Sequence, residues 1–380
     1  MAENKKHHFV PRFYLKHFSD NEKCINLFNI KSRTSVFNGG LRNQCYRDYF
    51  YGKDLQTEKA LSLVESHMSR IMRSIKAAGA LPSRISEDRL TFLLHVVMQH
   101  TRTAYSVDAF DEQTEKLMKH LIALDVKGMN LPSEEIANSN IRMKDSARFA
   151  LGIAAPNYTL LIDLEWKLIK APETHEFITS DNPVVYYNQL FSFRKNGCNT
   201  GLASKGLQIF FPLSPKYLVL LYDAKVYGVG PRRSEIIDIV DPRDVAQINR
   251  LQFVSALENV YFHDRCFPTI SEFQAAESYR RKQKSRMQSF PGQETVDRFT
   301  ELLLMSKVDI YTNLELSFVR ILKPAKEWLR SFRTQSRQPL VIVRNKQLSI
   351  DHETFLDMVK AKRYKHGEFF KYLREKFPTS

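Results

Sequence analysis

Apolar residues recur at intervals of three and four along two long segments near the N-terminus. In residues 54–78 they are Leu61, Val64, Met68, Ile71, Met72 and Ile75. In residues 86–106 they are Leu90, Leu93, Leu94, Val97 and Met98. This spacing puts the apolar side chains on one face of a helix, and Gly79 and Pro82 separate the two segments. We therefore predict two helices that lie antiparallel and pack against each other.

Other stretches have helix-terminal residues or the same periodicity. We predict helices at 9–18, at 108–125, at 142–170 with a break at Pro156, and from 242 to about 259 with Asp241 as the cap. Short apolar runs bounded by turn residues predict strands at 24–37, 176–187, 207–211, 217–222 and 340–344. The sum of these elements is an α+β fold, predominantly helical, with a small, mainly antiparallel sheet.

The 380 residues are long enough for more than one folding unit, and 43% of them are hydrophobic, which is ample for a core. We expect a mixed helix and strand domain over residues 1–265. Residues 266–380 form a basic, mainly helical C-terminal region, which can also pack on the first domain as one unit.

The formal net charge is +15, which attracts polyanions, most often nucleic acid. From Ile321 to Ser380, 14 lysines and arginines stand against 6 acidic residues, a net charge of +8. A second cluster, Arg280, Arg281 and Lys282, lies in a predicted helix that continues to Arg286. These features predict nucleic-acid binding by the C-terminal third, and a solvated helix face is the alternative.

Aromatic residues alternate with the C-terminal charges and could stack on unpaired bases, although some of them must be core at helical spacing. They are Tyr364, Phe369, Phe370 and Tyr372.

The four cysteines are scattered along the chain, which is typical of reduced thiols in a cytosol. The N-terminus lacks the apolar run of a signal peptide, and no stretch has the roughly 18 apolar residues of a membrane span. We therefore expect a cytoplasmic protein without a membrane partner.

Two carboxylates, Glu58 and Glu65, share the apolar face of the first long helix. In the second helix His95, Gln99 and Arg102 also share a face. Because a bare buried carboxylate costs several kcal/mol, we predict that Arg102 pairs with one of the two glutamates. The set is either a structural network between packed helices or a polar pocket that binds or activates a ligand.

Asp181-Asn182-Pro183 stands between two apolar strands. It is either a tight turn or a strand end that places a carboxylate in a site. His7-His8-Phe-Val-Pro11 resembles the start of HNH-type nucleases, although no Gly-Gly turn follows it.

The segment from His8 to Ser19, His-Phe-Val-Pro-Arg-Phe-Tyr-Leu-Lys-His-Phe-Ser, resembles the opening of the bacterial family catalogued as domain of unknown function 4238. Thr179-Ser-Asp-Asn-Pro-Val and Phe211-Pro-Leu-Ser-Pro are similar to two further motifs of that family. The resemblance spans about residues 7–265 and implies one domain with helical and strand parts, without an established activity. The residues it picks out are His8, Arg12, Glu58, Glu65, Gln99, Arg102, Asp181, Asn182 and Asn249.

These residues predict an enzyme that acts on nucleic acid or a nucleotide, in the manner of a nuclease-like hydrolase. The candidate catalytic residues are His8, Glu58, Glu65, Arg102 and Asp181. The candidate binding residues are Arg12, Gln99, Asn182, Asn249, Arg280, Arg281 and Lys282. A histidine among carboxylates would suit Mg²⁺ or Mn²⁺. The alternative is a non-catalytic polyanion-binding or regulatory module whose polar network is structural, and both readings leave the oligomeric state open.

Overall fold

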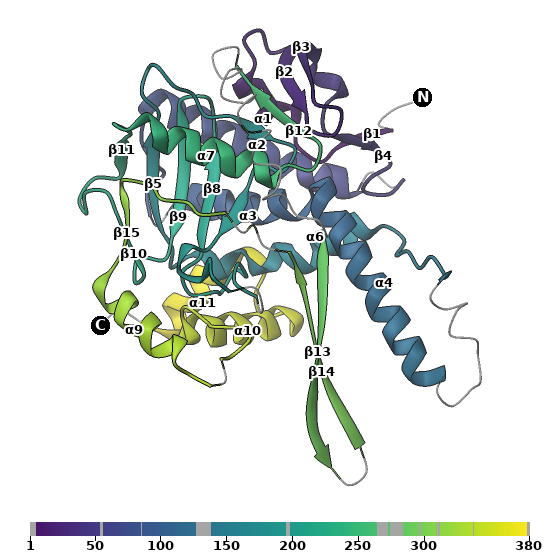
Figure 1. The fold of residues 1–380 in the computed structure, drawn as a ribbon. Helices are drawn as coiled ribbons and strands as arrows, with labels where there is room; N and C mark the ends of the chain where they lie inside the picture. The colour runs from purple at the N-terminus through teal and green to yellow at the C-terminus, as the bar shows by residue number, and fades with distance from the viewer. Residues whose placement is uncertain are drawn as a thin grey trace.

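The structure is a computed structural model. It describes residues 5–53, 56–84, 86–126, 138–194, 198–263, 273, 284–295, 298–308, 310, 312–336 and 338–377. Within these residues the chain is a mixed α+β protein, as predicted (Figure 1). The strands, however, form a five-stranded sheet, a four-stranded sheet and several two-stranded pairs rather than one small sheet.

The elements in the first part of the chain are β1 (Lys6–His8), α1 (Arg12–Leu15), β2 (Cys24–Asn29), β3 (Thr34–Gly40), β4 (Tyr46–Asp48), α2 (Gln56–Ala78), α3 (Glu87–Thr101), α4 (Ala104–Val126) and α6 (Ser146–Ala154). The central elements are β5 (Glu165–Lys170), β6 (Thr179–Ser180), β7 (Val185–Tyr187), β8 (Gln208–Pro212), β9 (Tyr217–Tyr222), β10 (Tyr227–Val229), β11 (Ile236–Asp238), α7 (Pro242–Ser255) and β12 (Asn259–Phe262). The last elements are β13 (Ser285–Thr295), β14 (Arg298–Lys307), β15 (Val319–Ile321), α9 (Lys323–Arg333), α10 (Lys346–Lys360) and α11 (Phe369–Lys376).

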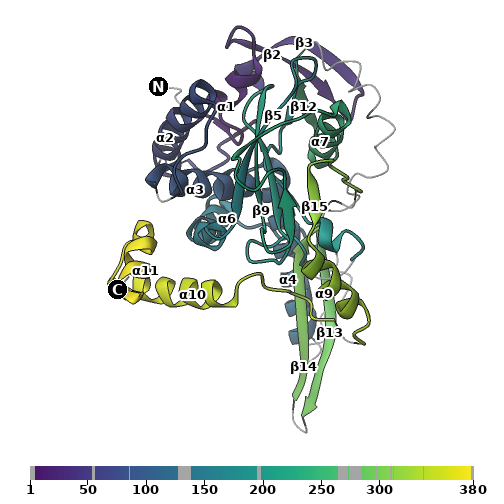
Figure 2. The same ribbon diagram turned by 90° about the vertical axis from the view of Figure 1, so that its left-hand side faces the viewer.

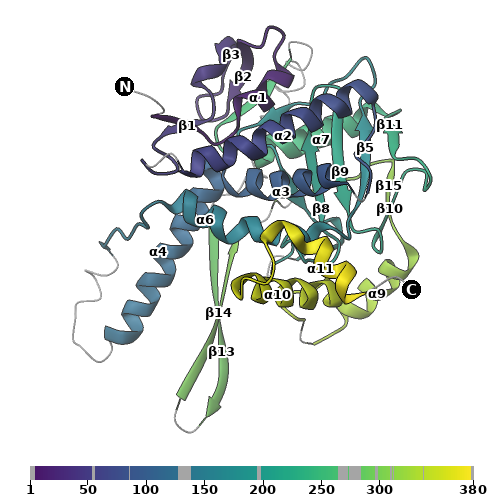
Figure 3. The same cartoon turned by 180° about the vertical axis from the view of Figure 1, so that it is seen from behind.

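The five-stranded sheet has the order β11-β5-β9-β8-β7 and is antiparallel except for the β11–β5 pair. Both of its faces are buried. In β9, Leu218 and Leu220 belong to one apolar core, whereas Val219 and Leu221 belong to the other. Helix α7 covers the first face, and α2 and α3 cover the second (Figures 2 and 3). The sheet therefore forms the middle layer of the protein.

A four-stranded antiparallel sheet has the order β3-β2-β12-β6. The predicted hairpin of residues 24–37 is present in it as β2 and β3. A separate short pair, β1 with β4, sets His7 opposite Arg47 and His8 opposite Tyr46. This pairing brings the N-terminal motif beside residues some 40 positions later in the chain.

The predicted helix pair is confirmed as α2 and α3, whose apolar faces share one core. Helix α3 begins after Ser86, whose side chain accepts a hydrogen bond from the backbone N–H of Arg89, as expected for a cap. It ends at Thr101 rather than at residue 106, and α4 begins three residues later.

Three predicted helical stretches are wrong in part. Residues 165–170 form β5, which is buried on both faces, so no strand-like alternation marks it in the sequence. The helix predicted to reach residue 259 ends at Ser255, and β12 follows. The basic cluster predicted to lie on a helix enters a strand at Ser285. Arg280, Arg281 and Lys282 themselves lie outside the described residues.

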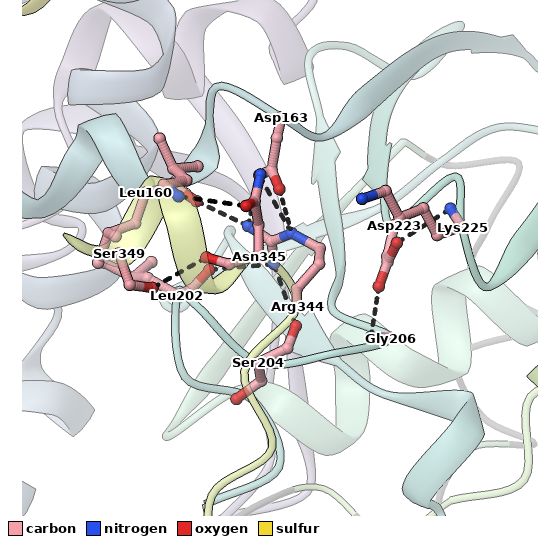
Figure 4. A network of polar contacts seen from close by, with 11 residues as sticks. Leu160, Asp163, Leu202, Ser204, Gly206, Asp223, Lys225, Arg344, Asn345 and Ser349 are labelled. Carbon is pink, nitrogen blue, oxygen red and sulfur yellow. Dashed lines mark hydrogen bonds and ion pairs between the residues drawn. The ribbon is translucent and has the colours of Figure 1, made fainter. Parts of the chain in front are cut away.

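The last part of the chain is joined to the preceding part by side chains and strands. β15 pairs with β10, and β13 with β14 forms a hairpin that projects from the body (Figures 1 and 2). The buried Arg344 guanidinium donates to the carboxylate of Asp163 and to the carbonyl oxygens of Leu160, Leu202 and Ser204 (Figure 4). The predicted division at residue 265 is crossed by these contacts and stays a prediction.

Two of the aromatic residues proposed to stack on bases are unavailable for that role. Phe369 and Tyr372 are buried in a small core that also contains Phe355 of α10. None of the helices in the described part of the chain has the length and apolarity needed to cross a membrane.

Candidate active site

A hollow of about 370 Å³ lies between the N-terminal motif and α2. Its lining is formed by His8, Pro11, Arg12, Phe13, Tyr51, Glu58, Lys59, Leu61, Ser62 and Glu65. Strand β1 supplies His8, α1 supplies Arg12, and α2 supplies the two glutamates, which lie about two turns apart. The structure thus brings together four residues that the sequence placed in one candidate site.

Glu65 is held by the predicted arginine. Its Oε1 atom lies 2.5 Å from Nη1 of Arg102, whose side chain is only 1% exposed, whereas that of Glu65 is 26% exposed. Burial lowers the pKa of Arg102, but the charge of Glu65 and the Tyr51 phenol outweigh burial and raise it. The guanidinium therefore stays charged, buried beside Glu65, which lines the hollow.

Gln99 links this ion pair to the N-terminal motif. Its Oε1 accepts a hydrogen bond from Nε of Arg102 at 2.9 Å, and its Nε2 donates to the carbonyl oxygen of Phe9 at 3.0 Å. Gln99 is buried and does not line the hollow, so its place is structural. The chain Phe9–Gln99–Arg102–Glu65 fixes the motif against both α2 and α3.

Glu58 has a different partner. Its Oε2 atom lies 3.5 Å from Nε2 of His7, which is buried. His7 Nδ1 accepts a hydrogen bond from the backbone N–H of Tyr51 at 3.1 Å. The Tyr51 hydroxyl in turn donates to the carbonyl oxygen of His8 at 3.2 Å. Glu58 therefore faces an imidazole, whereas Glu65 faces a guanidinium.

His8 is half-buried at the edge of the hollow. Its Nε2 atom is buried and has no hydrogen-bond partner among the described residues. Burial, followed by the charge of Arg12, lowers the pKa of His8 to about 4. The imidazole is therefore neutral near pH 7.

A second, open hollow of about 690 Å³ adjoins the first, and His8 and Arg12 line both. The complete lining of the second hollow is Lys5, Lys6, His8, Arg12, Arg42, Tyr46, Arg47 and Asp48. Five of these side chains are cationic and one is anionic. We call this second space the basic hollow.

The cations of the basic hollow are not all neutralised. Lys5 lies 2.9 Å from Asp48, and Arg47 lies 2.6 Å from Asp108. Arg12 and Arg42 are exposed and form no ion pair with any residue that the structure describes. The hollow therefore presents two unpaired guanidinium groups to solvent.

Asp181 does not line either of the two hollows that His8 lines. Its carboxylate accepts hydrogen bonds from the backbone N–H groups of Leu257, Glu258 and Asn259 at 2.7–3.0 Å. Burial raises the pKa of Asp181 to about 6, although these three donors favour the charged form. Asp181 lines a third hollow of about 150 Å³, which shares Tyr46 and Arg47 with the basic hollow, and it anchors the turn between α7 and β12.

Asn182 and Asn249 also form structural contacts rather than lining the first two hollows. Asn182 Nδ2 donates to Oγ of Ser255 at 2.9 Å. Asn249 Nδ2 donates to the carbonyl oxygen of Glu176 at 2.8 Å, and its Oδ1 accepts from the N–H of Ile178 at 3.0 Å. These side chains fasten the segment before the Asp-Asn-Pro turn to α7.

Comparison with protein families tests the family resemblance noted in the sequence. The model of the family described as "Protein of unknown function (DUF4238)" matches residues 6–266. The chain belongs to the DUF4238 family. Comparison with curated proteins and with solved structures found no match.

The DUF4238 range contains both hollows apart from Lys5, which lies one position before it. Arg344, by contrast, lies beyond the DUF4238 range yet donates to residues inside it.

The sequence reasoning missed several residues of these hollows. Tyr51, Lys5, Lys6 and Arg42 were not singled out, because the β1–β4 pairing that gathers them leaves no local pattern. The only local sequence signal for the basic hollow was the pair Lys5-Lys6 directly before His7-His8. Among the described residues no group of three or more His, Cys, Asp or Glu is placed to hold a metal ion.

Proposed function

We propose that the protein is a hydrolase of phosphate esters, acting on nucleotides or nucleic acid at the two hollows on either side of His8 and Arg12. The observation that carries the proposal is the basic hollow, with five cationic side chains against one carboxylate, two of the five being guanidinium groups that form no ion pair with any described residue. Guanidinium groups match phosphate oxygens in charge and in planar, two-pronged geometry.

The basic hollow binds the phosphate, and the reaction takes place where the two hollows meet. Arg12 and Arg42 hold the phosphate, and Lys6 adds charge at the rim. His8 stands where the hollows meet, and its neutral imidazole can accept a proton from water. The water oxygen then attacks phosphorus, the ester P–O bond breaks, and the proton passes from His8 to the leaving oxygen.

A bound phosphate would improve His8 as a base. Arg12 and Lys6 contribute to the lowered pKa of His8, after burial. An anion between these cations offsets their charge and therefore raises that pKa toward neutrality. Glu58, in the adjoining hollow, is the carboxylate placed to orient the water.

The competing proposal is a non-catalytic module that binds a polyanion. It is favoured by the pairing of the predicted polar residues with one another, because the side chains of Arg102 and Gln99 are engaged in structural hydrogen bonds and an ion pair. Both proposals predict phosphate binding, and only the first predicts turnover. The C-terminal third, with its net charge of +8 from Ile321 to Ser380, is a second candidate contact for nucleic acid.

The binding test compares wild type with Arg12→Ala/Arg42→Ala on a short single-stranded oligonucleotide over a range of salt concentrations. Loss of two phosphate contacts should reduce the slope of log K against log salt by about 1.4. The matched control is Arg232→Ala/Arg233→Ala, which removes the same charge from two exposed residues between β10 and β11. Equal losses in the two double variants would show that only net charge matters and would reject the basic hollow as the site.

Turnover is tested on mononucleotides, on the oligonucleotide and on bis(4-nitrophenyl) phosphate. We expect His8→Ala to abolish hydrolysis while binding of the oligonucleotide persists. If wild type binds the oligonucleotide through Arg12 and Arg42 but hydrolyses none of these esters, the module is the correct function.

A further inference from the structure

The backbone dictates which nitrogen of His7 carries the proton. The Tyr51 N–H donates to Nδ1 of His7 at 3.1 Å, so Nδ1 must have a free lone pair. A neutral imidazole then bears its hydrogen on Nε2. That atom lies 3.5 Å from Oε2 of Glu58, and neither atom has a hydrogen-bond partner among the described residues.

The ring of His7 is held in this orientation from both sides. It is 1% exposed and stacks on the Tyr51 ring, with centroids 5.6 Å apart and planes at 14°. The edge of Tyr49 closes the other side at 6.4 Å. A flipped ring would turn the N–H away from Glu58 and lose the bond from the Tyr51 backbone.

The two carboxylates of the hollow are thereby made unequal. Glu65 is matched by the buried cation Arg102, whereas Glu58 faces the Nε2 atom of His7 at 3.5 Å, a contact in which no hydrogen bond is formed in this structure and the charge of Glu58 is not cancelled. Glu58 is thus the carboxylate able to act on a ligand in the hollow.

We propose that His7 is a positioning residue, which holds Glu58 toward the reacting water through its Nε2–H. The inference rests on the proposed function for the role of Glu58, but the arrangement of the proton is independent of any activity.

The tautomer is tested on the wild-type protein by ¹⁵N NMR of the histidine rings at pH 7.5. We expect the Nε2 of His7 to show the shift of a protonated nitrogen and Nδ1 that of an unprotonated one. A proton on Nδ1 overturns the inference, whatever the outcome for hydrolysis.

The positioning role is tested with His7→Gln and His7→Leu, assayed on bis(4-nitrophenyl) phosphate. A glutamine amide can still donate to Glu58, so His7→Gln should keep kcat within about threefold of wild type. His7→Leu should lower kcat by about tenfold, the factor for one charge-assisted hydrogen bond that forms between Nε2–H and Glu58 once the hollow is occupied, with KM unchanged. Equal kcat in the two variants would overturn the role.

A double-mutant cycle separates positioning from packing. In a Glu58→Gln background, His7→Leu should lower kcat little further, because the carboxylate it positions is gone. An undiminished effect would mean that His7 acts only through packing. If no variant and no wild type hydrolyses any ester while the tautomer is as expected, the proposed function fails and the role of His7 fails with it, whereas the His7–Glu58 geometry stands.

Discussion

Replacement of Arg102 by alanine tests the buried ion pair most directly. The guanidinium is 1% exposed and bonds to Glu65 and Gln99. Its loss leaves the Gln99 carbonyl oxygen buried without its donor, which costs about 1–3 kcal/mol. Glu65 also loses its partner, but its side chain is 26% exposed, so water replaces part of that interaction. We expect a loss of about 3 kcal/mol in the free energy of unfolding, the lower end of the range for broken buried pairs.

The measurement is urea denaturation followed by far-ultraviolet circular dichroism. Arg70→Ala is the matched control, because Arg70 joins the same two helices through Asp88, with 58% and 35% of the side chains exposed. An exposed pair of this kind contributes under about 1 kcal/mol. If Arg102→Ala and Arg70→Ala shift the urea midpoint equally, the reasoning about burial is refuted.

Three further outcomes follow from the structure. The pKa values of His8 and His17 are lowered to about 4, mainly by burial, whereas in the unfolded chain these imidazoles have pKa values near 6.5. The free energy of unfolding should therefore be highest above pH 6.5 and fall as the pH drops from 6.5 to about 4. A melting temperature that is constant over this range would contradict the shifts. Asn249→Ala should cost about 2 kcal/mol in urea denaturation, because it frees a buried N–H and a carbonyl oxygen of the 176–178 segment; a midpoint equal to wild type would argue against that clamp. Arg344→Leu should make the C-terminal helices cleavable in limited proteolysis, with Arg330→Leu, an exposed change on α9, as the control that stays resistant; the reasoning fails if both variants are cut at the same rate.

The helix pair at the site could be predicted because its signal is local. Three-four spacing in α2 and α3, with Gly79 between them, determined both helices and their antiparallel packing. The same spacing predicted that Arg102 pairs with Glu58 or Glu65, and the structure shows Arg102 Nη1 2.5 Å from Oε1 of Glu65. For residues of the site that share one helix face, the periodicity of the sequence was sufficient to predict their contacts.

The rest of the site depends on contacts that the sequence does not mark. The basic hollow is assembled by the β1–β4 register, which joins residues 6–8 to residues 46–48. Asp181 was grouped with His8 because it follows a predicted strand and because the family resemblance picks out both residues. The structure shows that its carboxylate oxygens accept hydrogen bonds from the backbone near β12. Strand β5 was mistaken for helix because burial on both faces removes the alternation by which a strand is recognised.

The place of β12 in its sheet has a consequence for how the chain folds as it is synthesised. Residues 259–262 pair with β2 at residues 26–29 and with β6, and so lie between them. Until about 230 further residues have been made, the β2–β3 hairpin has an open edge. Such distant pairing slows folding and prolongs the exposure of apolar surface. A nascent chain halted before residue 259 should therefore bind general chaperones strongly, and one released after residue 262 should bind them far less.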